Sequence, residues 1–510
     1  MANNSTITDL LASGHDDAVA IAAPGRRPMT FAGLRALTSA VGADLNRLGI
    51  GRGDRVAIVL ANGPKMATAF LGIGASAATA PLNPGYRKAE FEFYLSDLRA
   101  SALVVEEGSD TPAIGAAAEL GVEVIQIATD TGADDRAGFW SFVERDRIKA
   151  GPRQSGPAGS DDEALVLHTS GTTSRPKIVP LLQRNIAATA GNITRTLDLS
   201  EQDRCLNVMP LFHIHGLMAC VLSPLSAGGS TYFTPGFDAL KFYKWLAEAD
   251  PTWYSAVPSM HQAVLARSGH NEESIASADL RFIRSSSASL PPQVMAKLEE
   301  VFAAPVVEAY AMTEAAHQMT CNPLPPAVRK PGTVGPAAGP EVAIMGENDE
   351  LLASGVEGEI VIRGDNVTPG YDQNLEANAA AFTAGWFRTG DLGFMDDDSY
   401  VTVSGRIKEI INRGGEKISP REVDDVLMDH PAVQQVVTFA VPHRMLGEDV
   451  AAVVVLSDGA EADPAAIREF AAERIAAFKV PRKILIVDEI PKGPTGKVRR
   501  IGLAEELGLV

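Results

Sequence analysis

The stretch Thr169–Lys177 (TSGTTSRPK) places short hydroxyl side chains and a glycine ahead of a lysine. It follows the apolar run Ala164–Leu167, so the pattern predicts a strand that ends in a loop rich in hydrogen-bond donors. Backbone N–H groups, hydroxyls and an ammonium can together surround a polyphosphate. The stretch lacks the second glycine of a Walker A loop, and an ordinary Ser/Thr-rich turn is the alternative interpretation.

Two further strings carry groups that suit a nucleotide. In EAYAMTE (308–314), the ring of Tyr310 can stack on a purine and the carboxylate of Glu314 can hold Mg²⁺. In WFRTGD (386–391), Asp391 can accept two hydrogen bonds from a ribose diol. The alternatives are that Tyr310 is a core aromatic residue and that Asp391 caps a turn.

A lysine and a glycine pair near the C-terminus offer different chemistry. Lys497 ends the string PKGPTGK, and its flexible ammonium can offset negative charge that develops on a carboxylate and a phosphate. Gly414 and Gly415 allow another molecule to approach the backbone closely. A solvated lysine and a plain glycine turn are the corresponding alternatives.

The elements that must position these residues follow an α/β pattern. Amphipathic segments such as Phe31–Leu48 alternate with short apolar runs such as Val56–Leu60 and Ala102–Val105. Residues 67–80 are apolar but small and glycine-broken, which favours a buried helix over a membrane span. A compact α/β pattern of about 100 residues follows a polar connector at 405–408, so a domain boundary and hinge are expected there.

Composition excludes several classes of protein. With 510 residues, 45% hydrophobic and 21% charged, the chain is typical of a soluble globular protein of two or more domains. The net charge of -19 argues against a nucleic-acid partner. Cys205, Cys220 and Cys321 are widely spaced, which predicts core positions, a reducing compartment and no metal cluster. The N-terminus has no secretory pattern, so a cytoplasmic protein without membrane insertion is expected.

Together these strings resemble the adenylate-forming superfamily of acyl-CoA synthetases, adenylation domains and luciferases. The resemblance implies a large N-terminal domain of stacked α/β subdomains plus a β-rich subdomain, and a small mobile α+β C-terminal domain. Residues 1–404 would bind ATP and the acid, and residues 405–510 would form a lid that carries the catalytic lysine. The chain departs from the family at Ile178, where a glycine is usual.

The resemblance also implies roles for individual residues. Lys497, Thr313 and Glu314 would be catalytic, with Glu314 on Mg²⁺, while Lys408 would be the hinge and Gly414 and Gly415 would meet CoA. The implied ATP-binding residues are Thr169, Ser170, Gly171, Thr172, Thr173, Lys177, Ala288, Glu308, Ala309, Tyr310, Thr313, Asp391, Arg406 and Lys497.

The segments expected to line the acid pocket are polar. A long alkyl chain would leave their hydroxyl and imidazole groups unpaired, whereas a short diacid could pair with them. The strings LFHIHGL, FIRSSSASL and EAYAMTEAAHQM resemble oxalate–CoA ligases, which implies that His213, Ser287 and His317 hold the acid. The choice among Ser285–Ser289 stays open, and His215 is expected behind the ligands.

The expected function is ATP-dependent ligation of an acid, most simply oxalate, to CoA through an acyl-adenylate, with Mg²⁺ and CoA as cofactor and co-substrate. Malonate or a fatty or aryl acid is the nearest alternative. A free-standing adenylation domain and a non-catalytic nucleotide-binding protein are more distant ones. The expected partner is a small carboxylic acid, and the expected state is a monomer or homodimer.

Overall fold

The computed structural model describes residues 5–128, 134–143, 151–152, 154–169, 176–457, 459–491 and 499–510. Packing divides the chain into two compact units. Unit 1 comprises the residues up to 169 together with 176–341 and 362–385, and unit 2 contains 342–361 and 386–510. The predicted boundary between residues 404 and 405 lies inside unit 2. It stays a prediction, because compactness does not show where a hinge turns.

An eight-stranded sheet in unit 1 has the order β15-β14-β13-β12-β10-β11-β1-β2. The strands from β14 to β1 run parallel, and β15 and β2 are antiparallel edges. Parallel strands bring their carboxyl ends to one edge, which is where ligands bind in such sheets. The strands are β1 (Val19–Ala22), β2 (Met29–Thr30), β10 (Arg204–Asn207), β11 (Ser230–Phe233), β12 (Trp253–Ala256), β13 (Phe282–Ser286), β14 (Val306–Met312) and β15 (His317–Cys321).

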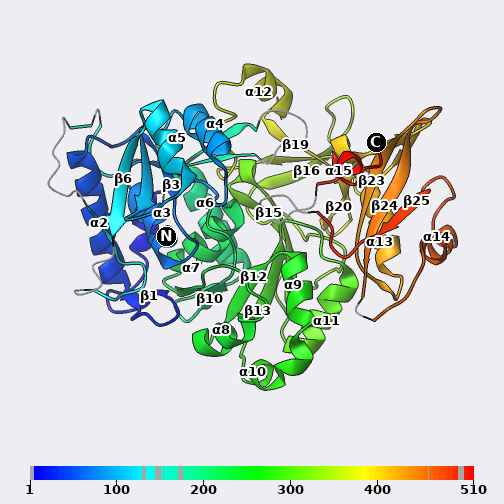
Figure 1. Cartoon of the computed structure of the whole chain (residues 1–510), viewed down its shortest axis with the longest axis horizontal. Coiled ribbons are helices and arrows are strands. Elements are labelled where there is room, and N and C mark those ends of the chain that lie inside the picture. Colours follow the sequence, from blue (N-terminus) through cyan, green and yellow to red (C-terminus); the bar gives the residue numbers. More distant parts are fainter. Residues whose placement is uncertain are drawn as a thin grey trace. The chain divides into compact units, whose positions relative to one another are not determined.

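Helices that follow successive parallel strands cover this sheet. The helices α8 (Phe242–Ala249), α9 (Pro258–Leu265), α10 (Glu272–Ala276) and α11 (Pro292–Phe302) lie around β12 and β13 in Figure 1. Phe242, Tyr254 and Leu298 belong to one buried cluster, so helices and strands share a core. Every residue of β12 and β13 is buried, as expected for strands covered on both faces.

A seven-stranded sheet in unit 1 has the order β7-β6-β5-β3-β4-β8-β9. Phe91 and Leu95 of α4 and Ala116 of α5 pack in one buried cluster with strand residues such as Leu103. The elements are α2 (Phe31–Arg47), β3 (Arg55–Val59), α3 (Pro64–Gly74), β4 (Ala78–Pro81), α4 (Lys88–Leu98), β5 (Ala102–Glu106), α5 (Pro112–Leu120), β6 (Glu123–Ala128), β7 (Ser141–Phe142), β8 (Glu163–His168), β9 (Ile178–Leu182) and α6 (Gln183–Thr196).

One prediction is only partly right in this sheet. The sequence favours a buried helix over a membrane span for residues 67–80, but the buried helix α3 ends at Gly74 and β4 begins at Ala78. Residues 67–80 are all buried, and burial alone does not distinguish a helix from a strand in a short apolar run. The three predicted core cysteines are buried. Within the described ranges, no helix is long and apolar enough to cross a membrane.

Shorter elements complete unit 1. The π-helix η1 lies directly after the histidine string, and single π turns are frequent at functional sites. These elements are α1 (Ile7–Leu11), η1 (Gly216–Leu222), α7 (Ser223–Ser226), η2 (Ser268–His270), η3 (Thr313–Ala315), α12 (Leu375–Ala381) and β18 (Phe382–Thr383).

Unit 2 contains two groups of strands. The first group comprises β16 (Glu341–Met345), β17 (Gly358–Arg363), β19 (Trp386–Met395) and β20 (Val401–Arg406), and the 3-10 turn η4 (Ile407–Glu409) follows it. The second group, drawn in orange and red in Figure 1, comprises β21 (Ile411–Arg413), β22 (Glu416–Ile418), β23 (Val433–His443), β24 (Gly447–Leu456) and β25 (Lys483–Ile486), with α13 (Pro420–Met428), α14 (Pro464–Ala472) and α15 (Leu503–Glu506).

Strand β24 lies in the middle of the second group and is buried on both faces. Val450, Ala452 and Val454 pack in one cluster, to which Val423 of α13 and Ile467 of α14 also belong. The alternate residues Ala451 and Val453 pack in a second cluster with Leu503 of α15. This alternation is the period of a strand between two covering layers.

Candidate active site

The strands β8 and β9 hold the two ends of the predicted phosphate loop together. They are antiparallel, with His168 opposite Ile178. Next to this pair, the Thr169 N–H donates to the Lys177 carbonyl at 2.9 Å, and the Lys177 N–H donates to Thr169 Oγ1 at 3.2 Å. The predicted Ser170, Gly171, Thr172 and Thr173 lie outside the described residues.

Ile178, which stands where the family usually has glycine, is the first residue of β9. Its side chain is 8% exposed and packs in the cluster of the seven-stranded sheet. An aliphatic residue at this position therefore extends the strand and strengthens its packing.

A lysine, a tyrosine and a carboxylate meet beside this loop. The Tyr371 hydroxyl donates to Glu314 Oε1 at 2.9 Å, and Lys177 Nζ lies 4.2 Å from the Tyr371 ring centroid. Burial, together with the charge of Glu314, raises the pKa of Tyr371, so the phenol stays a neutral donor. Glu314 lies on η3 beside Thr313 and is 7% exposed.

This group suits a phosphate and a magnesium ion. Mg²⁺ in nucleotide sites is held by one or two carboxylates and by substrate phosphates, and it keeps several waters. Glu314 is such a carboxylate, and Lys177 supplies a positive charge within the same group. In the described part of the chain, no cluster of three or more acidic, histidine or cysteine side chains offers an all-protein metal cage.

Some of the predicted nucleotide residues at the end of β14 are buried and hold neighbouring backbone, and others are accessible to solvent. Glu308 is 2% exposed, and its Oε1 accepts the Leu290 N–H at 2.8 Å, so it braces the turn after β13. The Ala309 carbonyl accepts the Ser286 hydroxyl at 2.8 Å. Tyr310 is half-buried and is therefore not a core aromatic residue, and Ala288 is exposed.

The predicted acid residues come from three elements at the carboxyl edge of the sheet. His215 Nδ1 lies 3.0 Å from Ser287 Oγ, and the His215 and His317 rings stack with centroids 5.0 Å apart. His213 is half-buried two residues before His215, after β10. His215 is fully buried while Ser287 is half-exposed, so His215 lies behind Ser287.

The backbone is strained at the predicted acid residues. Ser287 has φ 75°, Ala316 has φ 47° and His317 has φ 107°. A non-glycine residue at positive φ costs of order 1–3 kcal/mol and persists only where the surroundings impose it, as at ligand sites. The strain supports a role for Ser287 and His317 that glycine could not fill.

The predicted residues of unit 2 form two groups. Arg406 Nε lies 2.8 Å from Asp391 Oδ1, across the β19–β20 pair. Lys408 is exposed on η4, and Gly414 and Gly415 form the exposed turn between β21 and β22, with φ 61° and 99°. Lys497 lies outside the described residues.

The family follows from comparison with known proteins. Residues 10–372 match the family described as AMP-binding enzyme, and residues 422–497 match the AMP-binding enzyme C-terminal domain. The chain belongs to the AMP-binding enzyme family.

Two relatives of this AMP-binding enzyme are named oxalate–CoA ligases. It is 44% identical to an oxalate–CoA ligase of Arabidopsis thaliana, over 96% of this chain and 97% of that protein. It is 42% identical to an oxalate–CoA ligase of Saccharomyces cerevisiae, over 89% of this chain and 87% of that protein. Among solved structures it is similar to ATP-bound MatB from Rhodopseudomonas palustris, with a TM-score of 0.88, 29% identity and 99% of each chain covered.

These findings confirm the predicted superfamily and the α/β fold with a large N-terminal and a smaller C-terminal domain. They also confirm the predicted enzyme class, an AMP-forming acid–CoA ligase that uses ATP and works through an acyl-adenylate.

The site of this AMP-binding enzyme contains four residues that the sequence did not single out. Tyr371 contacts Glu314, and the fully buried Ser255, Arg284 and Gln318 lie behind the acid residues. Arg284 lies within the string FIRSSSASL, where an arginine inside a strand of small residues is the available signal. Ser255 and Gln318 look like ordinary strand residues in the sequence.

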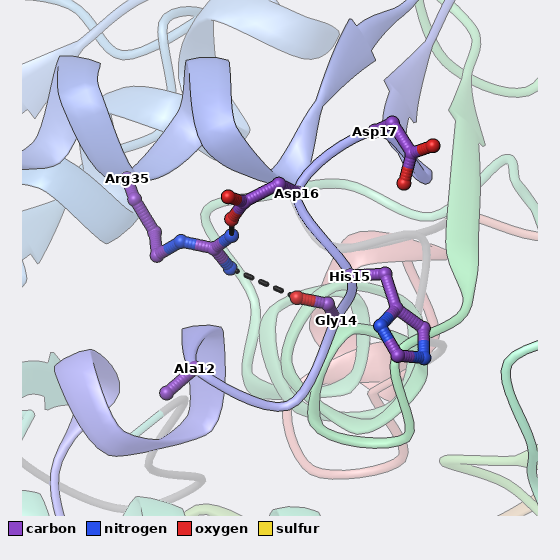
Figure 2. A pocket seen from close by; sticks show the side chains of 6 residues that line it. All are labelled: Ala12, Gly14, His15, Asp16, Asp17 and Arg35. Atoms are coloured by element: carbon purple, nitrogen blue, oxygen red, sulfur yellow. Dashed lines mark hydrogen bonds and ion pairs between the residues drawn. The ribbon is translucent and has the colours of Figure 1, made fainter.

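A surface hollow of about 560 Å³ near the N-terminus is not a candidate site. Figure 2 shows Arg35 directed toward Asp16 and toward the carbonyl of Gly14, which accepts at 3.1 Å. His15 is exposed and lies 3.5 Å from Glu201. These polar groups are already paired with one another on an open surface.

Proposed function

We propose that this AMP-binding enzyme joins oxalate to CoA. The observation that carries the proposal is the pocket of Ser287, His215 and His317, where buried imidazoles support a half-exposed hydroxyl on a strained backbone. The two relatives named oxalate–CoA ligases support the same substrate.

A small dianion suits this pocket better than an alkyl chain. A polar group left unpaired against hydrocarbon costs about 1–3 kcal/mol, and this pocket holds several such groups. The second carboxylate of a diacid must itself be paired before it can be buried, and charge-assisted hydrogen bonds supply that pairing. His213, Ser287 and His317 would therefore bind the carboxylate that does not react.

The first half-reaction forms the adenylate. One oxygen of the acid's other carboxylate attacks the α-phosphorus of ATP, the bond to the β-phosphate oxygen breaks, and pyrophosphate leaves. Lys177 and Lys497 offset charge on the phosphates, and Thr313 lies beside the reacting α-phosphate. Tyr310 would stack on adenine, while Asp391 would bind the ribose with Arg406 beside it.

Glu314, held by the Tyr371 hydroxyl, would carry Mg²⁺. When bound, Mg²⁺ supplies a Lewis acid that offsets the charge of the phosphate oxygens. The Tyr371 contact fixes the direction of the carboxylate before the nucleotide arrives.

The second half-reaction requires CoA and a different lid position. Residues 405–510 would turn about Lys408, which removes Lys497 and brings the turn of Gly414 and Gly415 to the pantetheine arm. The CoA thiolate then attacks the acyl carbon, the acyl–phosphate bond breaks, and AMP departs.

Pyrophosphate exchange tests the proposal. Purified protein is given ATP, labelled pyrophosphate and one acid from a panel of oxalate, malonate, acetate, coumarate and palmitate. Exchange that depends on oxalate at least 10-fold more than on any other acid supports the proposal. Faster exchange with malonate, an aryl acid or palmitate would show that this acid, and not oxalate, is the substrate. The absence of exchange with every acid would contradict the proposal and favour a non-catalytic nucleotide-binding protein.

A further inference from the structure

A guanidinium group lies completely buried behind the acid pocket. Arg284, on β13, is 0% exposed, and the atoms within hydrogen-bond distance of it are neutral acceptors. Its Nη2 donates to Gln318 Oε1 at 3.1 Å, and its Nη1 lies 3.4 Å from Ser255 Oγ and 3.5 Å from His215 Nε2. Gln318 is held by donating to Thr196 Oγ1 and to the Ala338 carbonyl, so its oxygen stays directed at the arginine.

The positive charge has no carboxylate beside it. No ion pair of the described residues includes Arg284, and burial lowers the pKa of its guanidinium. Arginine nevertheless stays protonated in proteins, and an isolated buried charge is costly. An anion that binds nearby would offset the free-energy cost of this buried positive charge.

The guanidinium orients the hydrogen-bond chain in front of it. Because arginine can only donate, a hydrogen bond from its Nη1 to Ser255 Oγ or to His215 Nε2 uses a lone pair of that atom. In the arrangement where both accept, the Ser255 hydroxyl hydrogen points to His215 Nε2, which lies 2.7 Å away, and the imidazole proton sits on Nδ1. Nδ1–H donates to Ser287 Oγ at 3.0 Å, which leaves the Ser287 hydroxyl hydrogen for the pocket.

We propose that Arg284 is a positioning residue that makes the acid pocket selective for a dianion, acting through Ser255, His215 and Ser287. Each hydrogen in the chain points from the buried cation toward the pocket, so the last donor meets the second carboxylate of the acid. The positive potential behind the chain stabilises that carboxylate more than a neutral group of the same shape. This inference depends on the proposed function, because it specifies how that site recognises its acid.

Oxalate and oxamate provide the test, because oxamate has the same shape but carries an amide in place of one carboxylate. In Arg284→Met we expect KM for oxalate to rise about 30-fold or more, the oxalate-to-oxamate ratio of kcat/KM to fall about 10-fold, and KM for ATP to change less than about 3-fold. Arg284→Lys keeps the charge and is expected to retain most of the ratio. A folded Arg284→Met with a wild-type ratio would overturn the proposal.

A second substitution neutralises the charge without removing the arginine. Gln318→Glu places a carboxylate where the amide oxygen now accepts from Arg284, at 3.1 Å, with almost no change in volume. We expect it to raise KM for oxalate about 10-fold more than Gln318→Ala, which removes the same amide without adding charge. Equal effects of the two variants would overturn the proposal, even if Arg284→Met does not fold.

The histidine tautomer is a readout that a purely structural role would not move. In protein labelled with ¹⁵N-histidine, the His215 signal, assigned with His215→Gln, should be that of a neutral ring with its proton on Nδ1. Arg284→Met should shift the signal toward the other tautomer, and a wild-type ring protonated on Nε2 would contradict the chain.

If wild-type protein uses another acid but not oxalate, the proposed function fails and this inference fails with it. If wild-type protein uses oxalate and the variants behave like it, only the role of Arg284 fails.

Discussion

The predicted acid residues of unit 1 and the predicted hinge and CoA residues of unit 2 differ in how deeply they are buried. In the pocket, His215, Arg284 and His317 are at most 1% exposed and are fixed by several elements of one sheet. In unit 2, Lys408, Gly414 and Gly415 are exposed on turns. From this difference we infer that recognition of the acid would depend on buried, tightly packed residues, whereas the change between half-reactions would depend on exposed turns.

The largest effect is expected at Lys497, in the predicted lid domain. Lys497→Ala should lower the rate of adenylate formation about 10³-fold, because an ammonium that offsets charge in the transition state is lost. Thioester formation from preformed adenylate and CoA should stay within about 3-fold of wild type. Pyrophosphate exchange and AMP release measure the two steps separately, and an equal loss in both would remove Lys497 from its role.

Two variants at the predicted magnesium site of unit 1 should lower the rate of adenylate formation by smaller and unequal factors. Glu314→Gln should lower adenylation about 10²-fold, because the carboxylate for Mg²⁺ is lost. Tyr371→Phe removes only the hydrogen bond to Glu314 and should cost about 5- to 10-fold, with a higher Mg²⁺ concentration at half-maximal rate. Titration of Mg²⁺ in the exchange assay measures both, and a larger loss in Tyr371→Phe would contradict this order.

Two substitutions of His317 distinguish the loss of acid binding from the release of backbone strain. His317→Ala and His317→Gly should both raise KM for oxalate about 30-fold and leave KM for ATP nearly unchanged, because both lose the imidazole. Since residue 317 has φ 107°, the glycine variant should be more stable to unfolding than the alanine variant by about 1 kcal/mol. Urea unfolding measures the difference, and a less stable glycine variant would show that this backbone is not strained.

The smallest effect is expected at the glycine turn of unit 2. Gly415 has φ 99° and open space around its Cα, so Gly415→Ala should act only through the backbone and raise KM for CoA about 5-fold. A Cβ at Gly414 would also lie 3.0 Å from the Leu446 side chain, so Gly414→Ala should cost slightly more. Adenylate formation should be unaffected in both variants, and a loss in that step would place the turn in the first half-reaction.

The sequence could predict which residues lie together within one string, and it could not predict contacts that depend on the order of the strands. The pairing of β8 with β9 keeps Thr169 and Lys177 adjacent, as a strand followed by a donor-rich loop indicated. Tyr371 meets Glu314 across 57 residues, and no local pattern encodes that contact.

Ser255 and Arg284 come together because β12 and β13 are neighbours in the sheet, with Ser255 opposite Arg284 in register. Periodicity predicts that both segments are buried strands, but it does not predict that they pair. The end of α3 at Gly74 was not predicted for a related reason. Residues 67–80 are all buried, so no hydrophobic periodicity distinguishes α3 from β4.

The kcat/KM of the wild-type protein for oxalate relative to oxamate tests most directly whether the pocket recognises a second negative charge. The two acids have the same shape, so size and hydrophobic contact cancel in the ratio. We predict a preference for oxalate of about 30-fold or more. A ratio near one, with both acids turned over, would contradict the claim that charge selects the acid.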